Sequence, residues 1–185
     1  YIACFCVCLI LRAKIVPPDV KKERKNSATD RTTKRWDLSL AYYMMVNWFI
    51  GIPIASAFDS NKGHDKTIAF FGGAMFVVVQ GMFYSLMRIN KFFSSYVRIQ
   101  KDRNHQVCRS GPYAYIRHPG YVLLFMQFCS TAILFQSFYG WIACSVSLFL
   151  LVLRTYLEDT TLQRELPGYK DYTQTVKYRL VPFIF

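Results

Sequence analysis

The sequence lacks the patterns that mark most soluble enzymes. It contains no GxSxG, HExxH or Walker-type phosphate loop, and no GxGxxG that follows a strand. Its six cysteines have no CxxC or CxxH spacing, so neither a zinc site nor a disulfide framework is indicated, and we expect reduced, mostly buried thiols. There is also no strand–helix alternation of the kind that builds a Rossmann fold. These absences leave the hydrophobic runs as the main signal.

Formal charge is missing from three long stretches. Residues 38–58 and 67–87 are each 21 uncharged residues long, and residues 121–153 extend this to 33. At the helical rise, each of the first two covers about 31 Å, enough to cross a bilayer core. The third fits a helical hairpin that turns near residues 136–140, with arms of about 24 Å. Residues 1–12 lack the charged region and cleavage site of a signal peptide, and we interpret them as the tail of a membrane helix.

Basic residues flank the uncharged stretches. Residues 12–37 hold nine Lys or Arg against four acidic residues, residues 88–118 hold seven against one, and residues 59–66 balance two against two. The positive-inside rule therefore places the first two segments in the cytoplasm and residues 59–66 on the opposite side. Nucleic-acid binding would instead gather basic residues on one soluble face, so we expect no nucleic-acid partner.

These features predict an all-α fold: a polytopic membrane helical bundle with about five membrane segments, the first of them partial. We interpret residues 1–185 as a single integral-membrane domain, with N-terminal membrane helices and a basic cytoplasmic loop in residues 1–93. Residues 94–185 then contain the helical hairpin and a polar cytoplasmic end. Within that end, "LPGY" (166–169) breaks a helix, and a second short helix is expected around residues 169–177.

Ionisable residues at the predicted membrane boundary are candidates for chemistry. Arg154 and Glu158 are four residues apart and share one helix face. An exposed pair of this kind contributes only about 0.3–0.5 kcal/mol, so stability hardly requires it. Ionisable groups at a membrane mouth are costly unless they pair or face a polar cavity. His118, between Arg117 and Pro119, could equally be a helix cap. The residues alone therefore indicate a small helical membrane protein with a polar cytoplasmic mouth.

Several motifs in the second half carry a family resemblance. "GPYAYIRHPGY" (111–121), a hydrophobic hairpin, R-x-x-x-E-D (154–159), "GYKDY" (168–172) and "YRLVP" (178–182) occur in that order. In combination, this pattern resembles the integral-membrane methyltransferases of the isoprenylcysteine carboxyl methyltransferase and phospholipid methyltransferase group. The resemblance covers roughly residues 94–185 and implies an S-adenosylmethionine-dependent methyltransferase. The cofactor pocket would face the cytoplasm, capped by the C-terminal helical segment. A lipophilic methyl acceptor would enter it from the surrounding membrane lipids.

The resemblance also implies roles for individual residues. Arg154 would face the substrate, and Arg117 would support catalysis. A carboxylate acceptor needs only orientation, for which either arginine could supply paired hydrogen bonds. An amine acceptor must lose a proton, which would require Glu158 or His118 as a base. The residues that would contact the cofactor are Gln100, His105, Gln106, Val107, Cys108, Tyr113, His118, Pro119, Gly120, Tyr121 and Glu158.

Some positions depart from the isoprenylcysteine enzymes. Glu158-Asp159 stands where a run of glutamates is usual, and "ELPGY" (165–169) stands where "FG" is usual. The methyl acceptor is therefore left open between an isoprenylcysteine-type carboxylate, a lipid headgroup or amine, and a thiol. The expected location is a prokaryotic inner membrane or the endoplasmic reticulum.

Two other function classes compete with a methyltransferase. One is a membrane NAD(P)H-dependent reductase related to the sterol reductases. The other is a non-catalytic membrane scaffold, for which Arg154, Glu158 and His118 should tolerate alanine. Binding of the respective cofactor distinguishes the three classes.

Overall fold

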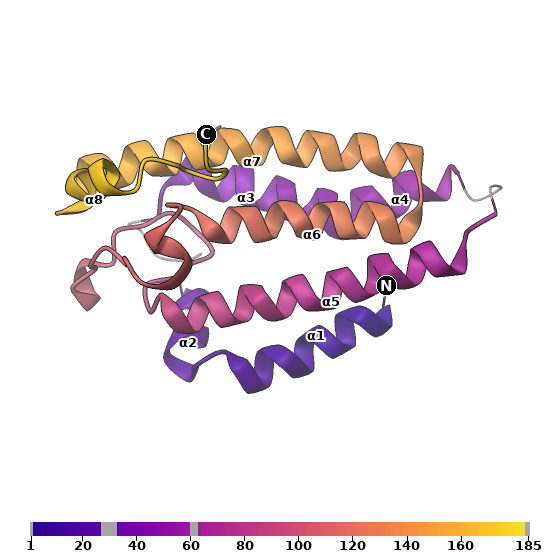
Figure 1. Cartoon of the computed structure of the whole chain (residues 1–185), viewed down its shortest axis with the longest axis horizontal. Coiled ribbons are helices and arrows are strands. Elements are labelled where there is room, and N and C mark those ends of the chain that lie inside the picture. Colours follow the sequence, from indigo (N-terminus) through magenta and orange to yellow (C-terminus); the bar gives the residue numbers. More distant parts are fainter. Residues whose placement is uncertain (1, 27–32, 60–62, 184–185) are drawn as a thin grey trace.

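The computed structural model describes residues 2–26, 33–59 and 63–183, and within these ranges it contains helices and no strand. The all-α prediction is therefore confirmed (Figure 1). The α-helices are α1 (Ile2–Ile15), α2 (Pro18–Asn26), α3 (Arg35–Val46), α4 (Ile52–Ala57), α5 (Lys66–Ile89), α6 (Pro119–Phe135), α7 (Phe138–Glu165) and α8 (Tyr169–Thr175). A π-helical segment, η1 (Asn47–Gly51), joins α3 to α4, and two 3-10 turns, η2 (Lys101–Arg103) and η3 (Gly111–Ala114), lie in the loop before α6.

Three helices are long and apolar enough to cross a membrane: Arg35–Ala57, Lys66–Ile89 and Phe138–Glu165. Two further helices, α6 with 17 residues and α1 with 14, are shorter. Large apolar side chains on the outside of the bundle, such as Phe70 and Phe149, are 70% exposed. The protein is therefore built as a membrane protein, since exposed apolar helix faces of this size suit lipid. The expectation of about five spans stays a prediction.

The first span is continuous through a π-helical segment because of Pro53. A proline has no N–H, and its ring clashes with the carbonyl four residues earlier in a regular α-helix. Here the turn before Pro53 is widened, and the N–H of Ile52 bonds to the carbonyl of Asn47, five residues earlier. The Asn47 amide also donates to the Ala143 carbonyl (2.8 Å) and to Ser147 Oγ (2.6 Å) on α7. The widened turn is thus fixed to the neighbouring helix.

The predicted hairpin is present, and its turn lies at the expected place. Helix α6 ends at Phe135, Gln136 adopts a left-handed conformation, and α7 begins at Phe138. Ser137 caps α7 by accepting from the N–H of Gly140, and its hydroxyl donates to Asp59 (2.8 Å). The expected helix break is also confirmed, because α7 ends at Glu165 and α8 begins at Tyr169.

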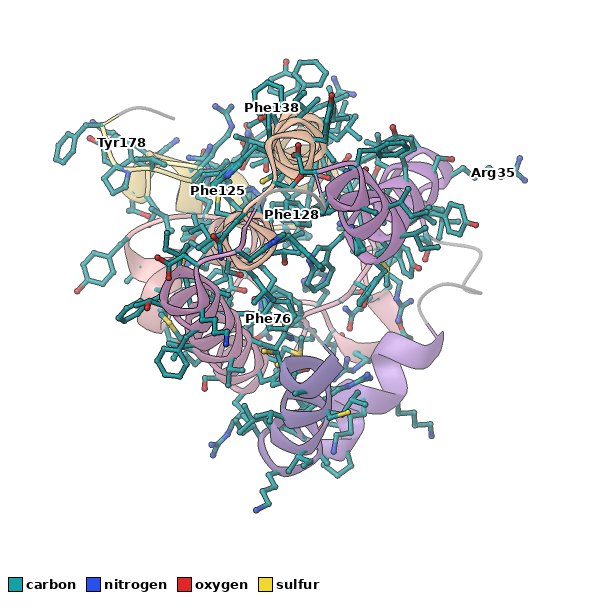
Figure 2. All side chains as sticks on the ribbon, turned by 90° about the vertical axis from the view of Figure 1, so that its right-hand side faces the viewer. Arg35, Phe76, Phe125, Phe128, Phe138 and Tyr178 are labelled. Atoms are coloured by element: carbon teal, nitrogen blue, oxygen red, sulfur yellow. The ribbon has the colours of Figure 1, made fainter. Side chains whose placement is uncertain are left out.

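Close packing of α5 on α6 depends on one glycine. A Cβ on Gly72 would lie 2.6 Å from the backbone nitrogen of Leu134, so only glycine allows the two helices this close. Helix α1 packs on the other side of α5, and the α3–α4 helix packs on α7. In the end-on view of Figure 2, Phe76 and Phe128 point into the space between these helices. Both are 1% exposed.

The connections gather at the two ends of the bundle. Figure 1 shows α2, the loop before α6 and α8 at one end, whereas the end of α4, the start of α5 and the hairpin turn lie at the other. The two segments rich in Lys and Arg therefore share an end with the C-terminal segment, as the charge distribution predicts.

Candidate active site

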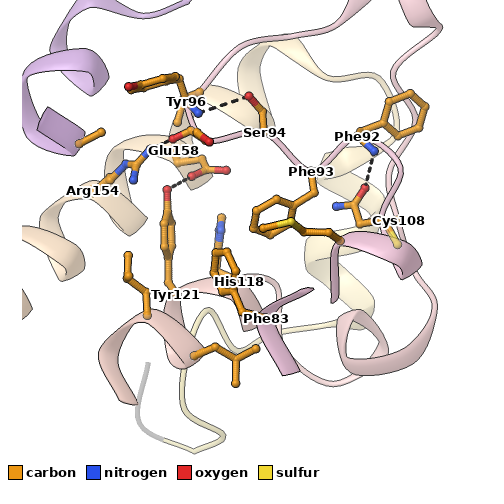
Figure 3. A pocket seen from close by; sticks show the side chains of 18 of the residues that line it. Phe83, Phe92, Phe93, Ser94, Tyr96, Cys108, His118, Tyr121, Arg154 and Glu158 are labelled. Carbon is orange, nitrogen blue, oxygen red and sulfur yellow. Dashed lines mark hydrogen bonds between the residues drawn. The ribbon is translucent and has the colours of Figure 1, made fainter. Parts of the chain in front are cut away.

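A cavity of about 580 Å³ opens at the end of the bundle that carries α8. Its volume is in the range of small-molecule and cofactor sites. One part is lined mostly by apolar residues of α1, α3, η1, α5 and α6, with Arg12 and Gln80 among them. The other part is lined by the loop before α6 and by polar residues of α6 and α7 (Figure 3). Since α1 packs on α5 and α3 packs on α7, the apolar part lies between these two helix pairs.

Three polar side chains meet at the polar end of the cavity. The Tyr121 hydroxyl donates to Glu158 Oε2. The Arg154 guanidinium lies 5.3 Å from the centroid of the Tyr121 ring, in cation–π geometry. Figure 3 shows Arg154, Tyr121 and Glu158 side by side. The four-residue spacing of Arg154 and Glu158 thus places both on the cavity face of α7, beside the first turn of α6.

Arg154 is held by an acidic residue that the sequence analysis did not select. Its Nε donates to Asp37 Oδ1 (2.6 Å), and its Nη2 donates to Asp37 Oδ2 (3.1 Å) and to the Ser95 carbonyl (2.7 Å). Asp37 is fully buried and also accepts from the N–H of Val97 (2.7 Å). Within residues 2–26, 33–59 and 63–183, no acceptor is found for Nη1 of Arg154. That nitrogen can therefore donate to a ligand.

Asp159 accepts hydrogen bonds from three other parts of the chain. Its carboxylate accepts from Arg117 Nε (2.8 Å) and Nη2 (3.0 Å), from Tyr169 (3.0 Å) and from Arg179 Nε (2.9 Å). His118 Nε2 lies 3.2 Å from the same carboxylate. Asp159 is fully buried. The neighbouring acidic residues of α7 therefore have different tasks: Glu158 lines the cavity, and Asp159 joins the loop, α7, α8 and the C-terminal segment.

Arg117 is engaged in this network. Beyond Asp159, its Nη1 donates to the carbonyls of Val176 (2.8 Å) and Lys177 (2.7 Å). Backbone N–H groups of Arg117 and His118 donate to the carbonyls of Tyr178 and Arg179. Burial opposes the charge on Arg117, but the hydrogen bond and charge of Asp159 outweigh it and raise the pKa of Arg117. In this arrangement the guanidinium fastens the C-terminal segment; its catalytic role stays a prediction.

The "RHPGY" motif places His118 and Tyr121 by local geometry. His118 is the N-cap of α6 and Pro119 its first residue, where a missing N–H costs nothing. A Cβ on Gly120 would lie 3.0 Å from the Phe93 ring, so the glycine lets that ring reach the helix. The rings of His118 and Tyr121 then stack at 5.7 Å with an interplanar angle of 15°. Both rings line the cavity.

The loop residues His105, Gln106, Val107 and Cys108 also line the cavity. The His105 ring lies 4.7 Å from that of Phe92, and burial, followed by the charges of Arg98 and Arg103, lowers its pKa to about 4. His105 is therefore neutral at pH 7.

Tyr113 and Tyr172 close the cavity beneath α8. The Tyr172 hydroxyl donates to the Tyr113 carbonyl (2.6 Å). Burial raises the pKa of Tyr113 well above its ordinary value and that of Tyr172 to about 12. Both phenols are thus uncharged at neutral pH and serve as aromatic walls and donors.

Most of the residues selected from the sequence meet in this cavity, and two do not line it. Gln100 is fully buried, where its amide donates to the Phe92 carbonyl (2.7 Å) and accepts from Arg103 (2.8 Å). Pro119 is buried in the first turn of α6. The selected residues that line the cavity are His105, Gln106, Val107, Cys108, Tyr113, Arg117, His118, Gly120, Tyr121, Arg154 and Glu158.

Asp37, Asp159 and Tyr169 belong to the site but were not among the residues selected from the sequence. Asp37 had a visible signal, since it is an acidic residue directly before an uncharged stretch, at the end of a segment with a net positive charge. Tyr169 follows the helix break, where only the folded chain shows that α8 turns back over the cavity.

Comparison with known families agrees with the geometry. No curated protein matches the chain. Residues 73–164, which include most of α5, the loop, α6 and nearly all of α7, match the model of the isoprenylcysteine carboxyl methyltransferase (ICMT) family. The match starts earlier than the segment that carries the motifs, and it gives no support to a sterol-reductase-like enzyme. The chain belongs to the isoprenylcysteine carboxyl methyltransferase family.

Proposed function

We propose that the protein uses S-adenosylmethionine to methylate a lipophilic acceptor at the cytoplasmic face of a membrane. The observation that carries the proposal is the composition of the cavity. A polar end containing Glu158, Tyr121 and Arg154 continues into an apolar part between helices of the bundle. A site of this form can hold a charged cofactor and a hydrocarbon chain in contact with each other. Membership of a methyltransferase family supports the same chemistry.

The residues at the polar end fit the cofactor. Its ammonium and sulfonium are cationic, and Glu158 is an acidic residue facing the cavity without an arginine bonded to its carboxylate in the described residues. The rings of Tyr121, His118 and Phe93 surround the same space and can receive a cationic methyl group by cation–π contact. When bound, S-adenosylmethionine supplies the methyl group for an in-line displacement. The protein contributes positioning and exclusion of water.

Arg154 is placed to orient the acceptor. Its Nε and Nη2 are fixed by Asp37, and the Nη1 hydrogens remain for a ligand. A carboxylate acceptor needs this orientation and no base. An amine acceptor must lose a proton, and His118 or Glu158 would then be the base. Asp37 fixes the position of the guanidinium, and the remaining N–H groups of Arg154 can bond to an anion. A carboxylate is therefore our preferred class of methyl acceptor.

The orientation of the protein follows from charge. The described residues of the basic segments 12–37 and 88–118 lie at the end of the bundle that contains the polar part of the cavity. Basic flanks face the cytoplasm in multi-pass membrane proteins. We therefore place the polar end of the cavity, with α8 over it, on the cytoplasmic side.

Calorimetry with S-adenosylhomocysteine tests the proposal on detergent-solubilised protein. Wild-type protein should bind it, and Glu158→Ala should lose binding because the acidic partner of the cationic amino group is gone. Glu165→Ala is the matched control: it removes an exposed carboxylate from the same helix, outside the cavity lining, and should leave binding unchanged. Folded wild-type protein that shows no heat of binding would overturn the proposal.

A further inference from the structure

Gln127 on α6 is the one buried residue of the described chain whose side-chain polar atoms lack any hydrogen-bond partner. Both Oε1 and Nε2 are without a partner within the described residues, although the side chain is only 2% exposed. Burying an unpaired amide costs stability, so such groups are rare in folded proteins. Gln127 also lines the cavity. A group that weakens the empty protein and faces its ligand site is a candidate for ligand recognition.

The polar groups around Gln127 are satisfied without its side chain. Ser130 Oγ (2.8 Å) and Thr131 Oγ1 (2.9 Å) both donate to the backbone carbonyl of Gln127. The Trp48 indole N–H in turn donates to Thr131 Oγ1 (2.9 Å). This local network thus closes on itself and leaves the Gln127 amide free for the cavity.

The position of Gln127 separates it from the reacting groups. It lies six residues after Tyr121 on the same helix, which is about 9 Å further along the axis, toward the apolar part of the cavity. Helices α5 and α6 run antiparallel and approach closely where Gly72 meets Leu134. From this point toward the α8 end of the bundle, Gln80 lies about 12 Å along α5, and Gln127 lies about 10 Å along α6. The two glutamines are thus at similar depth, and both line the cavity.

We propose that Gln127 recognises a second polar group on the methyl acceptor, carried within its hydrocarbon chain about 9 Å from the end that is methylated. This inference rests on the proposed function and specifies its substrate class. A carboxamide both donates and accepts, so its complement is an uncharged group that does the same: a hydroxyl or an amide. A cationic group could bond only to the carboxamide oxygen and an anionic group only to its NH₂, and either charge would be buried at this depth without a counter-ion. The acceptor is therefore a functionalised chain rather than a plain hydrocarbon tail.

The test uses hexadecanoic acid, its hydroxy isomers with the hydroxyl at successive carbons, and the corresponding amines. Binding is measured calorimetrically with protein in lipid nanodiscs, without any methyl donor. For wild-type protein, one range of hydroxyl positions should bind about fivefold more tightly than the unsubstituted chain, the worth of one hydrogen bond. In Gln127→Met, which keeps the shape and removes the amide, this preference should disappear while the unsubstituted chain binds as before.

Gln174→Leu is the matched control, because this amide is exposed on α8 and lies outside the cavity lining. It should keep the hydroxyl preference. Ligand-free Gln127→Met should also melt at a higher temperature than wild type, since an unpaired buried amide is removed; Gln127→Leu serves the same comparison if the Met variant does not fold. No hydroxyl preference in either series, or a preference that persists in both Gln127 variants, overturns the inference. Binding of S-adenosylhomocysteine without any hydroxyl preference would refute this inference and leave the methyltransferase proposal standing. A hydroxyl preference without binding of S-adenosylhomocysteine would refute the methyltransferase proposal and leave Gln127 as a recognition site for a hydroxylated chain that is not a methyl acceptor.

Discussion

Replacing Asp37 by alanine should destabilise the protein strongly. The Asp37 side chain is fully buried, that of Arg154 is 8% exposed, and two hydrogen bonds of 2.6 and 3.1 Å join them. The variant would leave the guanidinium with the Ser95 carbonyl and the Tyr121 ring, and it would remove the acceptor of the Val97 N–H. Removing one partner of a buried pair costs about 3–5 kcal/mol, so we expect a loss of that size in the free energy of unfolding.

Denaturant titration in mild detergent, followed by tryptophan fluorescence, measures this loss. The ion pair of Lys34 and Glu165 is the matched control: it joins the N-cap residue of α3 to the last residue of α7 at 2.6 Å, but its side chains are 30% and 42% exposed. Lys34→Met should therefore cost no more than about 1 kcal/mol. The double variant Asp37→Ala with Arg154→Met should be more stable than Asp37→Ala alone, since the unpaired charge is gone. Equal losses in Asp37→Ala and Lys34→Met, or no recovery in the double variant, would refute the reasoning.

Two further predictions concern packing and pH. Gly72→Ala should lower the free energy of unfolding by several kcal/mol, because its Cβ would meet the Leu134 backbone at 2.6 Å. Gly81→Ala has nothing within 4 Å of its Cβ and should be neutral or stabilising by up to about 1 kcal/mol. Thermal melting compares the two variants directly. For His105, the pKa falls from about 6.5 in the unfolded chain to about 4 in the fold, so the unfolded state binds more protons between these values and stability drops as pH falls from 6.5 to 4. The drop is at most about 3 kcal/mol, and His105→Gln should abolish this part of the pH dependence in melting curves recorded from pH 4 to 7; an unchanged profile would contradict the assigned pKa.

Local patterns predicted the features that depend on local causes. The turn at Gln136 and Ser137 was predictable because the uncharged run is too long for one membrane crossing. The break at Pro167 was predictable because proline ends a helix. The cavity face of α7 was visible in the four-residue spacing of Arg154 and Glu158. Gly120 was selected as a cofactor contact, and only the structure shows that its missing side chain makes room for the Phe93 ring.

Contacts between distant residues escaped the sequence analysis. Asp37 and Arg154 are 117 positions apart, and nothing in either neighbourhood specifies the other. Counted with the flanking charges, Asp37 looked like an ordinary boundary residue. Arg117 was expected to support catalysis, and the structure directs its donors to Asp159 and to carbonyls of the C-terminal segment. Charge and spacing selected Arg154 and Glu158, and the family resemblance supplied most of the other selected residues that line the cavity. Their division into ligand-facing and fastening groups needs the tertiary structure.

The Asp159 network sets an order of events during synthesis. A chain grows from its N-terminus, and Asp159 enters the membrane region 20 positions before Arg179, which shares its carboxylate. The carbonyls that receive Arg117 and His118 belong to residues 176–179 and are also made late. Until then, a carboxylate that is fully buried in the finished protein has only part of its donors. The helices can therefore insert one after another as they are made, whereas Asp159, Arg117 and His118 gain their full set of partners only after residues 176–179 have been made and have docked. The α8 side of the cavity is thus the last part of the site to be completed.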